Sequence, residues 1–399
     1  MDALKVFLGA TEVGVLEHFE DESQRFTFAP SYVSAFADSR PVLGQIFEDR
    51  RPHAIDVGGP MGWFSHLLPQ GVMRRWRARL LGLDEDDAFG LLKQLGEDMP
   101  GAVVLTPGQP LLSTSPAVPA TEAPKADSDD GSLLKFSLAG AQWKLSARSS
   151  GRGLTTRVET EGTACIAKFH APEYPGLPCC EFATMNWARL AGLNVPRFEL
   201  RQVADFDQIP EEMPTGDGNV YVVERFDRAA NGRIHMEDFA QILDKPPSEQ
   251  YKGAYEEIAA VLRRIAPESA AEFLKLTVFN ILCGNGDAHL KNFSVLYPDG
   301  RNAVLSLAYD LVSTVLYYPP GKEGLALKLN GEKLFQNITW SSFDNLLDRL
   351  VMSREVGRQI LQDAAEATLS AWNFGEVREN YTQKQQERLE IHIRSLSLV

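Results

Sequence analysis

Hydrophobic and polar residues alternate along the first thirty residues, a pattern typical of half-buried strands. The runs LKVFLG (4–9), TEVGVLEHF (11–19) and RFTFAP (25–30) predict a small antiparallel sheet, and GAVVLTP (101–107) predicts a closing strand. Helical patterns occupy 62–83 and 84–97, and Asp84 is the expected N-cap of the second helix.

A second set of alternating runs begins after residue 132 and surrounds one helical pattern, EFATMNWARLAGL (181–193). The pattern becomes helical from about residue 236. The expected strands are 133–138, 141–149, 153–159, 163–169, 197–206 and 219–228, and the expected later helices are 254–266, 268–283, 341–351, 354–374 and 382–396. The last helix opens with a capping box formed by Thr382 and Gln385.

One segment has the composition of an extended linker. Residues 106–131 contain five prolines among Ser, Thr, Ala and acidic residues. We therefore expect a first domain over 1–107, a linker over 108–131, a strand-rich lobe over 132–228 and a helical lobe over 229–399.

Composition and charge exclude several classes of protein. The net charge of −14 argues against direct, sequence-independent binding of nucleic acid, which needs a basic surface. The four cysteines have no metal-ligand spacing, and the adjacent pair Cys179–Cys180 is a poor disulfide framework, so we expect free thiols in a reducing cytoplasm. The sequence shows no signal peptide and no apolar run long enough to span a bilayer.

The stretch GNGDAHLKNF (284–293) carries the strongest chemical signal. Asp287 and Asn292 are five positions apart, a spacing that phosphotransferases use to hold a catalytic base and a metal ligand in one loop. Lys291 or His289 could then face the transferring phosphate. The alternative is a polar turn that caps a helix, with Gly284 and Gly286 as termination signals.

Other candidate residues follow in the order that such a site requires. Asp310 ends the apolar strand LSLAYD and could be a second metal ligand. Lys168, in TACIAKF, could bind the ATP phosphates, and Glu181 on the next helix could be its partner. Each of these residues alone also fits an ordinary capping or surface role.

Two further segments could complete a nucleotide site. The turn in KFSLAGAQWKLS could be a phosphate lid, which would use Ser137, Gly140, Gln142 and Lys144. The run VVERFDR could meet adenine through the backbone near Glu224 and Phe226, with Asp227 near the ribose. The alternatives are a plain hairpin and a charged strand end.

Together these segments resemble the HipA family of bacterial serine/threonine kinase toxins. The segments that carry the resemblance are SLAGAQWKL, AKF, EFATMNWARLAGLNVPRFEL, VERFDR, NGDAHLKNFSVL, LAYDLVST and the first-domain run from Trp63 to Leu105. The resemblance covers nearly the whole chain apart from the linker. It implies an α+β fold, in which a bilobal protein-kinase-like body carries an additional small N-terminal β/α subdomain.

The resemblance also implies a role for each matching residue. Asp287 would be the catalytic base, and Asn292 and Asp310 would bind Mg²⁺. The implied ATP-binding residues are Lys168, Glu224, Phe226, Asp227, His289 and Tyr309, and the implied phosphate loop contains Ser137, Ala139, Gly140, Ala141 and Gln142. Ser137 would be autophosphorylated, which would add negative charge beside the ATP phosphates and silence the kinase.

The implied partners are a HipB-like helix-turn-helix antitoxin, operator DNA bound through that antitoxin, and an aminoacyl-tRNA synthetase as substrate. The acidic charge suits this division, because the antitoxin would supply the basic DNA-binding surface. Two rival hypotheses remain at this level. One is a small-molecule kinase like the aminoglycoside and choline kinases, and the other is a catalytically silent corepressor.

Overall fold

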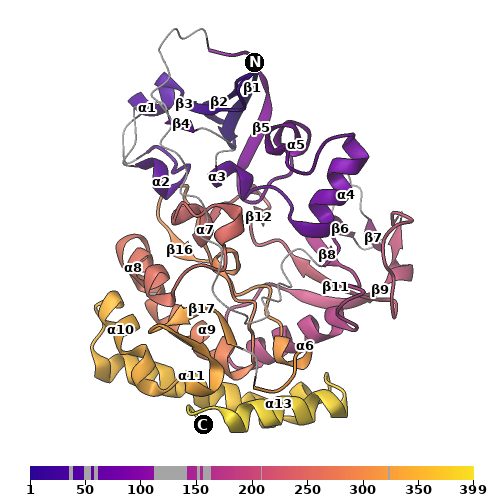
Figure 1. Cartoon of the computed structure of the whole chain (residues 1–399), viewed down its shortest axis with the longest axis vertical. Helices are drawn as coiled ribbons and strands as arrows, with labels where there is room; N and C mark the ends of the chain where they lie inside the picture. The colour runs from indigo at the N-terminus through magenta and orange to yellow at the C-terminus, as the bar shows by residue number, and fades with distance from the viewer. Residues whose placement is uncertain are drawn as a thin grey trace. The chain divides into compact units, whose positions relative to one another are not determined.

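The computed structural model describes residues 1–35, 39–48, 55–57, 62–111, 142–150, 153–155, 163–207, 209–321 and 324–399. The strand expected at 133–138, most of the linker and Ser137, Ala139, Gly140 and Ala141 lie outside these ranges. The chain forms two compact units (Figure 1). The first comprises Met1–Phe136, Asp227–Gln250 and Ser294–Ala303, and the second comprises Ser137–Phe226, Tyr251–Phe293 and Val304–Val399. The four segment boundaries expected from the sequence remain predictions.

The first unit contains the antiparallel sheet that the alternating runs predicted. Its strand order is β4-β3-β2-β1-β5. The strands are β1 (Asp2–Leu8), β2 (Thr11–His18), β3 (Gln24–Phe28), β4 (Ile55–Val57) and β5 (Val103–Gly108). Leu4, Val6 and Leu8 alternate along β1 and are buried, so the period-two pattern gave the correct inward face.

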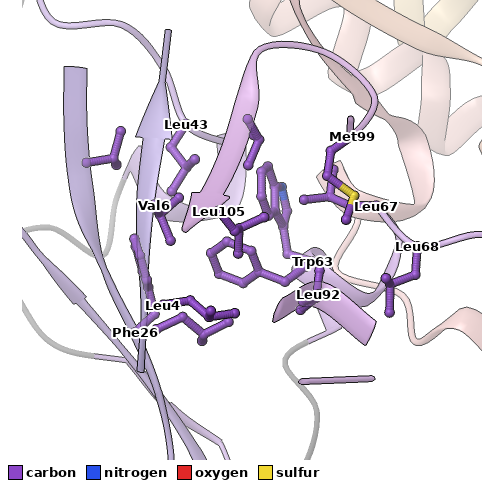
Figure 2. Packing of buried hydrophobic residues seen from close by; sticks show 14 of the residues in the cluster. Leu4, Val6, Phe26, Leu43, Trp63, Leu67, Leu68, Leu92, Met99 and Leu105 are labelled. Atoms are coloured by element: carbon purple, nitrogen blue, oxygen red, sulfur yellow. The ribbon is translucent and has the colours of Figure 1, made fainter. Parts of the chain in front are cut away.

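Helices cover the buried face of this sheet. They are α1 (Pro30–Ser34), α2 (Gln45–Glu48), α3 (Gly62–Ser65), α4 (Gly71–Leu81) and α5 (Ala88–Leu95). Figure 2 shows Leu4, Val6 and Leu105 of the sheet gathered with Trp63 and Leu92 of the helices in one core.

The predicted N-cap of α5 was wrong by three residues. Asp87, not Asp84, accepts a hydrogen bond from the Gly90 N–H at 2.8 Å. The side chain of Asp84 instead accepts from the N–H of Asp86 at 2.9 Å, which forms a turn just before the helix. Several acids in a row therefore identify the helix start but not the cap itself.

The first unit also includes short elements from later in the chain. They are β12 (Arg228–Ala229), β13 (Gly232–Arg233), β14 (His235–Asp238), α7 (Phe239–Ile242) and β15 (Ser294–Tyr297). Strands β14 and β15 pair antiparallel. The sequence pattern predicted helices from about residue 236, and it missed β14 because four residues are too short to establish a period.

The second unit contains a six-stranded sheet in the order β10-β7-β6-β8-β11-β9. The strands are β6 (Lys144–Ser150), β7 (Gly153–Thr155), β8 (Thr163–Lys168), β9 (Phe198–Gln202), β10 (Phe206–Asp207) and β11 (Asn219–Glu224). Helix α6 (Leu177–Leu190) packs on β9 and β11. It begins four residues before the predicted start, because Gly176 and Pro178 open it without any polar cap.

Helices form the rest of the second unit, with the short strands β16 (Val304–Leu305), β17 (Gly324–Leu329) and β18 (Glu332–Leu334). The helices are α8 (Tyr255–Ile265), α9 (Ala270–Leu282), α10 (Asp344–Leu350), α11 (Arg354–Asn373), α12 (Gly375–Arg378) and α13 (Gln383–Ser395). The predicted capping box of Thr382 and Gln385 is confirmed.

A tryptophan joins the helices of the second unit to α6. The indole of Trp187 lies 5.6 Å from the ring of Phe279 and 4.8 Å from the ring of Trp372, and it donates to the Thr368 carbonyl at 2.8 Å. Because α6 also carries Glu181, this packing fixes the position of that acid relative to the helices. No helix in the described ranges is long and apolar enough to cross a membrane.

Candidate functional site

The loop after α9 is shaped by its two glycines. Gly284 has φ +68°, a conformation that favours glycine, and a Cβ there would lie 2.5 Å from the side chain of Val315. The Gly286 N–H donates to Thr314 Oγ1 at 2.7 Å, and the same hydroxyl donates to the Gly284 carbonyl at 3.1 Å. The loop is therefore more than a helix ending, because it is bonded to the segment that follows Asp310.

Asp287 has a rigidly held backbone inside this loop. Its N–H donates to Asn285 Oδ1 at 3.1 Å, and Asn285 in turn donates to Asn280 Oδ1 at 2.9 Å. The Asp287 carbonyl accepts from the His289 N–H at 2.7 Å and from Asn292 Nδ2 at 2.8 Å. The five-residue spacing thus brings Asp287 and Asn292 into direct contact.

Two aromatic residues contact each other next to the Asp287 carboxylate. The Tyr251 hydroxyl donates to Asp287 Oδ1 at 2.6 Å, and its ring meets His289 edge-on at 4.7 Å between centroids. His289 Nδ1 accepts from the Lys291 N–H at 3.2 Å. Burial, together with the charge of Lys291, lowers the pKa of His289 to about 3, so this imidazole is neutral at pH 7.

Lys168 forms ion pairs with two carboxylates. The side chains of Lys168 on β8 and Glu181 on α6 are buried and paired, and Lys168 also pairs with Asp310. Burial opposes the charge of Lys168, but Asp310 and Glu181 outweigh it and raise the pKa of the ammonium. An ordinary surface role is excluded for Lys168 and Glu181, because only 6% and 1% of their side chains are exposed.

The two carboxylates differ in environment. Burial raises the pKa of Glu181 to about 7 against the opposing charge of Lys168. The pKa of Asp310 falls to about 2, because Lys168 and Lys144 outweigh the effect of its burial. Asp310 also has φ +53°, a strained conformation for a residue other than glycine. Strain at a charged residue is frequent at ligand sites.

Lys144 brings a second positive charge to this region. It lies directly opposite Lys168 in the β6–β8 pairing, which places both side chains on the same face of the sheet. Of the expected phosphate loop, only Gln142 lies in the described ranges. Its Nε2 is buried with no hydrogen-bond partner among the described residues.

The expected adenine-binding residues are partly brought together. The rings of Phe226 and Tyr309 lie 5.4 Å apart, and the Tyr309 hydroxyl donates to the Lys291 carbonyl at 2.7 Å. Glu224 ends β11, where its N–H donates to the Arg197 carbonyl at 2.8 Å. Tyr309 thereby connects this strand end to the loop that contains Asp287.

Asp227 belongs to the first unit. Its carboxylate accepts from the Gly101 N–H at 2.8 Å and pairs with Arg228 at 2.8 Å. These contacts give it a structural role in that unit, and the ribose role remains a prediction.

The sequence patterns gave no role to two residues of the site, Tyr251 and Thr314, although Thr314 ends the segment LAYDLVST. Tyr251 lies 36 positions before Asp287, and Thr314 lies 28 positions after Gly286. Neither residue belongs to a spacing that suggests its contact. Only the fold reveals their roles.

Comparisons with known proteins agree on one family. The HipA N-terminal domain matches residues 4–106, and the HipA-like C-terminal domain matches residues 136–372. A Sinorhizobium fredii protein named "Putative kinase Y4dM" is 33% identical over 92% of this chain and 91% of its own length. The serine/threonine-protein kinase toxin HipA of Shewanella oneidensis is 26% identical over 76% of each chain.

The fold agrees with a solved structure. The chain superimposes on the Shewanella oneidensis MR-1 HipA, from the complex of HipA, HipB and operator DNA, with a TM-score of 0.71 and 21% identity. The match covers 99% of this chain and 96% of the other. The predicted bilobal, kinase-like α+β fold is confirmed. With both family domains matched in order over most of its length, this chain belongs to the HipA family.

Proposed function

We propose that this protein is an ATP-dependent serine/threonine protein kinase and the toxin of a toxin–antitoxin pair. The observation that carries the proposal is the buried ion-pair cluster of Lys168, Glu181 and Asp310. The same unit holds Asp287 in a separately fixed loop. Kinases need such a lysine–glutamate pair, a metal-binding acid and a catalytic base.

Asp287 would act as the catalytic base. The γ-phosphoryl group would pass from ATP to a serine hydroxyl, whose proton would go to Asp287, leaving ADP and phosphoserine. The buried Lys168 would bind the α- and β-phosphates, with its direction fixed by Glu181. Lys144 would add charge to the same face of the sheet.

Asn292 and Asp310 would hold Mg²⁺. An amide oxygen and a carboxylate are the oxygen ligands that this ion accepts, and its remaining positions would go to phosphate oxygens and water. When bound, the ion would neutralise charge that develops on the transferring phosphate. The described ranges contain no group of three or more His, Cys, Asp or Glu that could hold a metal without a nucleotide.

The nucleotide would lie against Glu224, Phe226, His289 and Tyr309, and the ribose role of Asp227 stays a prediction. Contact between Phe226 and Tyr309 supports an aromatic surface for adenine. The Gln142 amide, which has no partner among the described residues, supports a phosphate loop that gains its bonding partner from a ligand. We propose that phosphorylation of Ser137, in the same loop, switches the kinase off.

Family membership supports the proposed partners. A helix-turn-helix antitoxin would hold the kinase inactive and carry it to operator DNA, as the HipA, HipB and DNA complex suggests. A net charge of −14 suits a protein that leaves DNA contact to a basic partner. The substrate would be an aminoacyl-tRNA synthetase, so that phosphorylation halts translation.

The proposed substrate can be tested with purified synthetases. The wild-type protein and Asp287→Gln would each be incubated with magnesium, γ-labelled ATP and a panel of aminoacyl-tRNA synthetases from the host. Label on a synthetase serine with the wild type alone supports the proposal. In parallel incubations with an aminoglycoside or choline, label on the small molecule with none on protein favours a small-molecule kinase instead. ATP binding without any transfer favours a silent corepressor.

A further inference from the structure

Tyr251 belongs to none of the motifs above, yet it touches the candidate base. It lies just before α8, and its hydroxyl donates to Asp287 Oδ1 at 2.6 Å. This is a short, charge-assisted hydrogen bond to the carboxylate that would accept the serine proton. We propose that Tyr251 is a positioning residue that orients the Asp287 carboxylate toward the acceptor hydroxyl. This inference rests on the proposed kinase function.

The need for such a residue follows from how Asp287 is held. Its N–H and carbonyl are bonded to Asn285 and Asn292, so its backbone is fixed. The last torsion of an aspartate is broad, and a fixed backbone does not determine where the two oxygens point. A donor on one oxygen removes that freedom. Catalytic bases in other enzymes are oriented by a third group in the same way.

Tyr251 is itself held on two sides. Its ring meets the His289 ring edge-on, with an interplanar angle of 86°. The chain just after it is bonded to β17, because the Gly253 carbonyl accepts from the Lys328 N–H at 3.0 Å. A Cβ on Gly253 would lie 3.2 Å from Leu290 of the Asp287 loop, so backbone and loop are in close contact. The donor is therefore in place before any substrate arrives.

The tyrosine leaves room for an acceptor on the same carboxylate. An ionised carboxylate has two oxygens and about four acceptor positions. The bond from Tyr251 to Oδ1 is therefore compatible with a further donor, such as a serine hydroxyl, on the same carboxylate. The opposite idea is that the phenol occupies the place of the acceptor and must leave, and the two ideas predict opposite effects of removing the hydroxyl.

Tyr251→Phe tests the proposal because it removes the hydroxyl and keeps the ring against His289. Tyr255→Phe is the matched control. Tyr255 is also a tyrosine of this segment, and its buried hydroxyl has no hydrogen-bond partner in the described part of the chain. ADP formation would be followed at a series of Mg-ATP concentrations, together with the thermal midpoint of each variant.

We expect the maximal rate of Tyr251→Phe to fall about tenfold to a hundredfold, as for other misplaced catalytic groups. The half-saturating ATP concentration should stay within about twofold, since adenine and phosphates are bound elsewhere. Tyr255→Phe should match the wild type. Tyr251→Leu, which also removes the ring, should be at least as slow as Tyr251→Phe. In an Asp287→Asn background, Tyr251→Phe should cause no further loss.

Three results would overturn the inference. An unchanged or faster Tyr251→Phe would mean that the hydroxyl is idle or competes with the acceptor, while the kinase proposal would stand. Weaker ATP binding with the same maximal rate would assign Tyr251 to the nucleotide instead. A wild-type protein that forms no ADP with Mg-ATP would remove both the proposed function and this inference.

Discussion

Replacing Lys168 by methionine should destabilise the second unit strongly. Methionine fills a similar volume but leaves Glu181 and Asp310 close together without a cation. The Glu181 side chain is 1% exposed, whereas 31% of the Asp310 side chain reaches solvent. The cost therefore falls mainly on Glu181, whose buried carboxyl group must either keep its charge without a cation or take up a proton.

The size of the effect follows from this burial. Removing one partner of a buried ion pair costs about 3 to 5 kcal/mol. For a unit of this size, that loss corresponds to a thermal midpoint lower by roughly 6 to 20 °C. Glu181→Gln should cost only about 1 kcal/mol, because the amide oxygen still accepts from Lys168 and the pair with Asp310 survives.

The double variant tests the reasoning more sharply than either single change. Lys168→Met with Glu181→Gln leaves only the partly exposed Asp310 carboxylate, so it should be about 1 to 3 kcal/mol more stable than Lys168→Met alone. Thermal and urea unfolding of the four proteins would measure these differences. Equal losses of stability for the two single variants, or additive losses in the double variant, would refute the idea that Lys168 stabilises the fold by balancing the charges of Glu181 and Asp310.

Two more predictions concern buried groups away from Asp287. Burial raises the pKa of Glu237 to about 7, although Tyr297, Trp63 and the Gln45 N–H donate to its carboxylate. Its pKa is higher in the folded state than in the unfolded state, so its contribution to stability falls by up to about 3 kcal/mol as pH rises from about 4.5 to 7. Glu237→Gln should therefore gain stability relative to the wild type between pH 5.5 and 7.5 in urea unfolding, and a relative loss would contradict this sign. The buried Thr184 hydroxyl contacts the hydroxyls of Ser313 at 3.1 Å and Tyr381 at 3.0 Å, so Thr184→Val should cost about 2 kcal/mol. Thr184→Val and Ser313→Ala should be non-additive in a double-mutant cycle, and strict additivity would show that the contact carries no energy.

The parts of the fold that the sequence predicted are those with a long, regular period. Alternation of apolar residues along β1, β2 and β3 gave the first sheet, although five consecutive residues of β2 are buried in the structure. The long helix α11 buries one face, whereas α9 is buried along most of its length. Strand β14, with four residues, has no measurable period, and the start of α6 has no polar cap to reveal it.

In the site too, contacts between residues close in the sequence were predicted better than contacts between distant residues. The spacing of Asp287 and Asn292 predicted that they share a loop, and their direct contact is local in sequence. The link from Lys168 to Asp310 spans 142 positions. The sequence assigned the two residues to one nucleotide site, but it did not predict that they are in direct contact. Tyr251 belongs to no predicted motif, so only packing places it on Asp287. Asp227 follows Phe226 directly, yet it belongs to the other compact unit, which sequence proximity does not reveal.

The most direct test of the central claim is intact-mass analysis of the purified protein after incubation with Mg-ATP, beside Asp287→Gln. The account predicts one added phosphate on the wild type, mapped to Ser137, and none on the variant. Equal phosphate on both proteins would contradict the assignment of Asp287 as catalytic base. No phosphate on the wild type, with ATP bound, would contradict the proposal that this chain phosphorylates itself as a kinase.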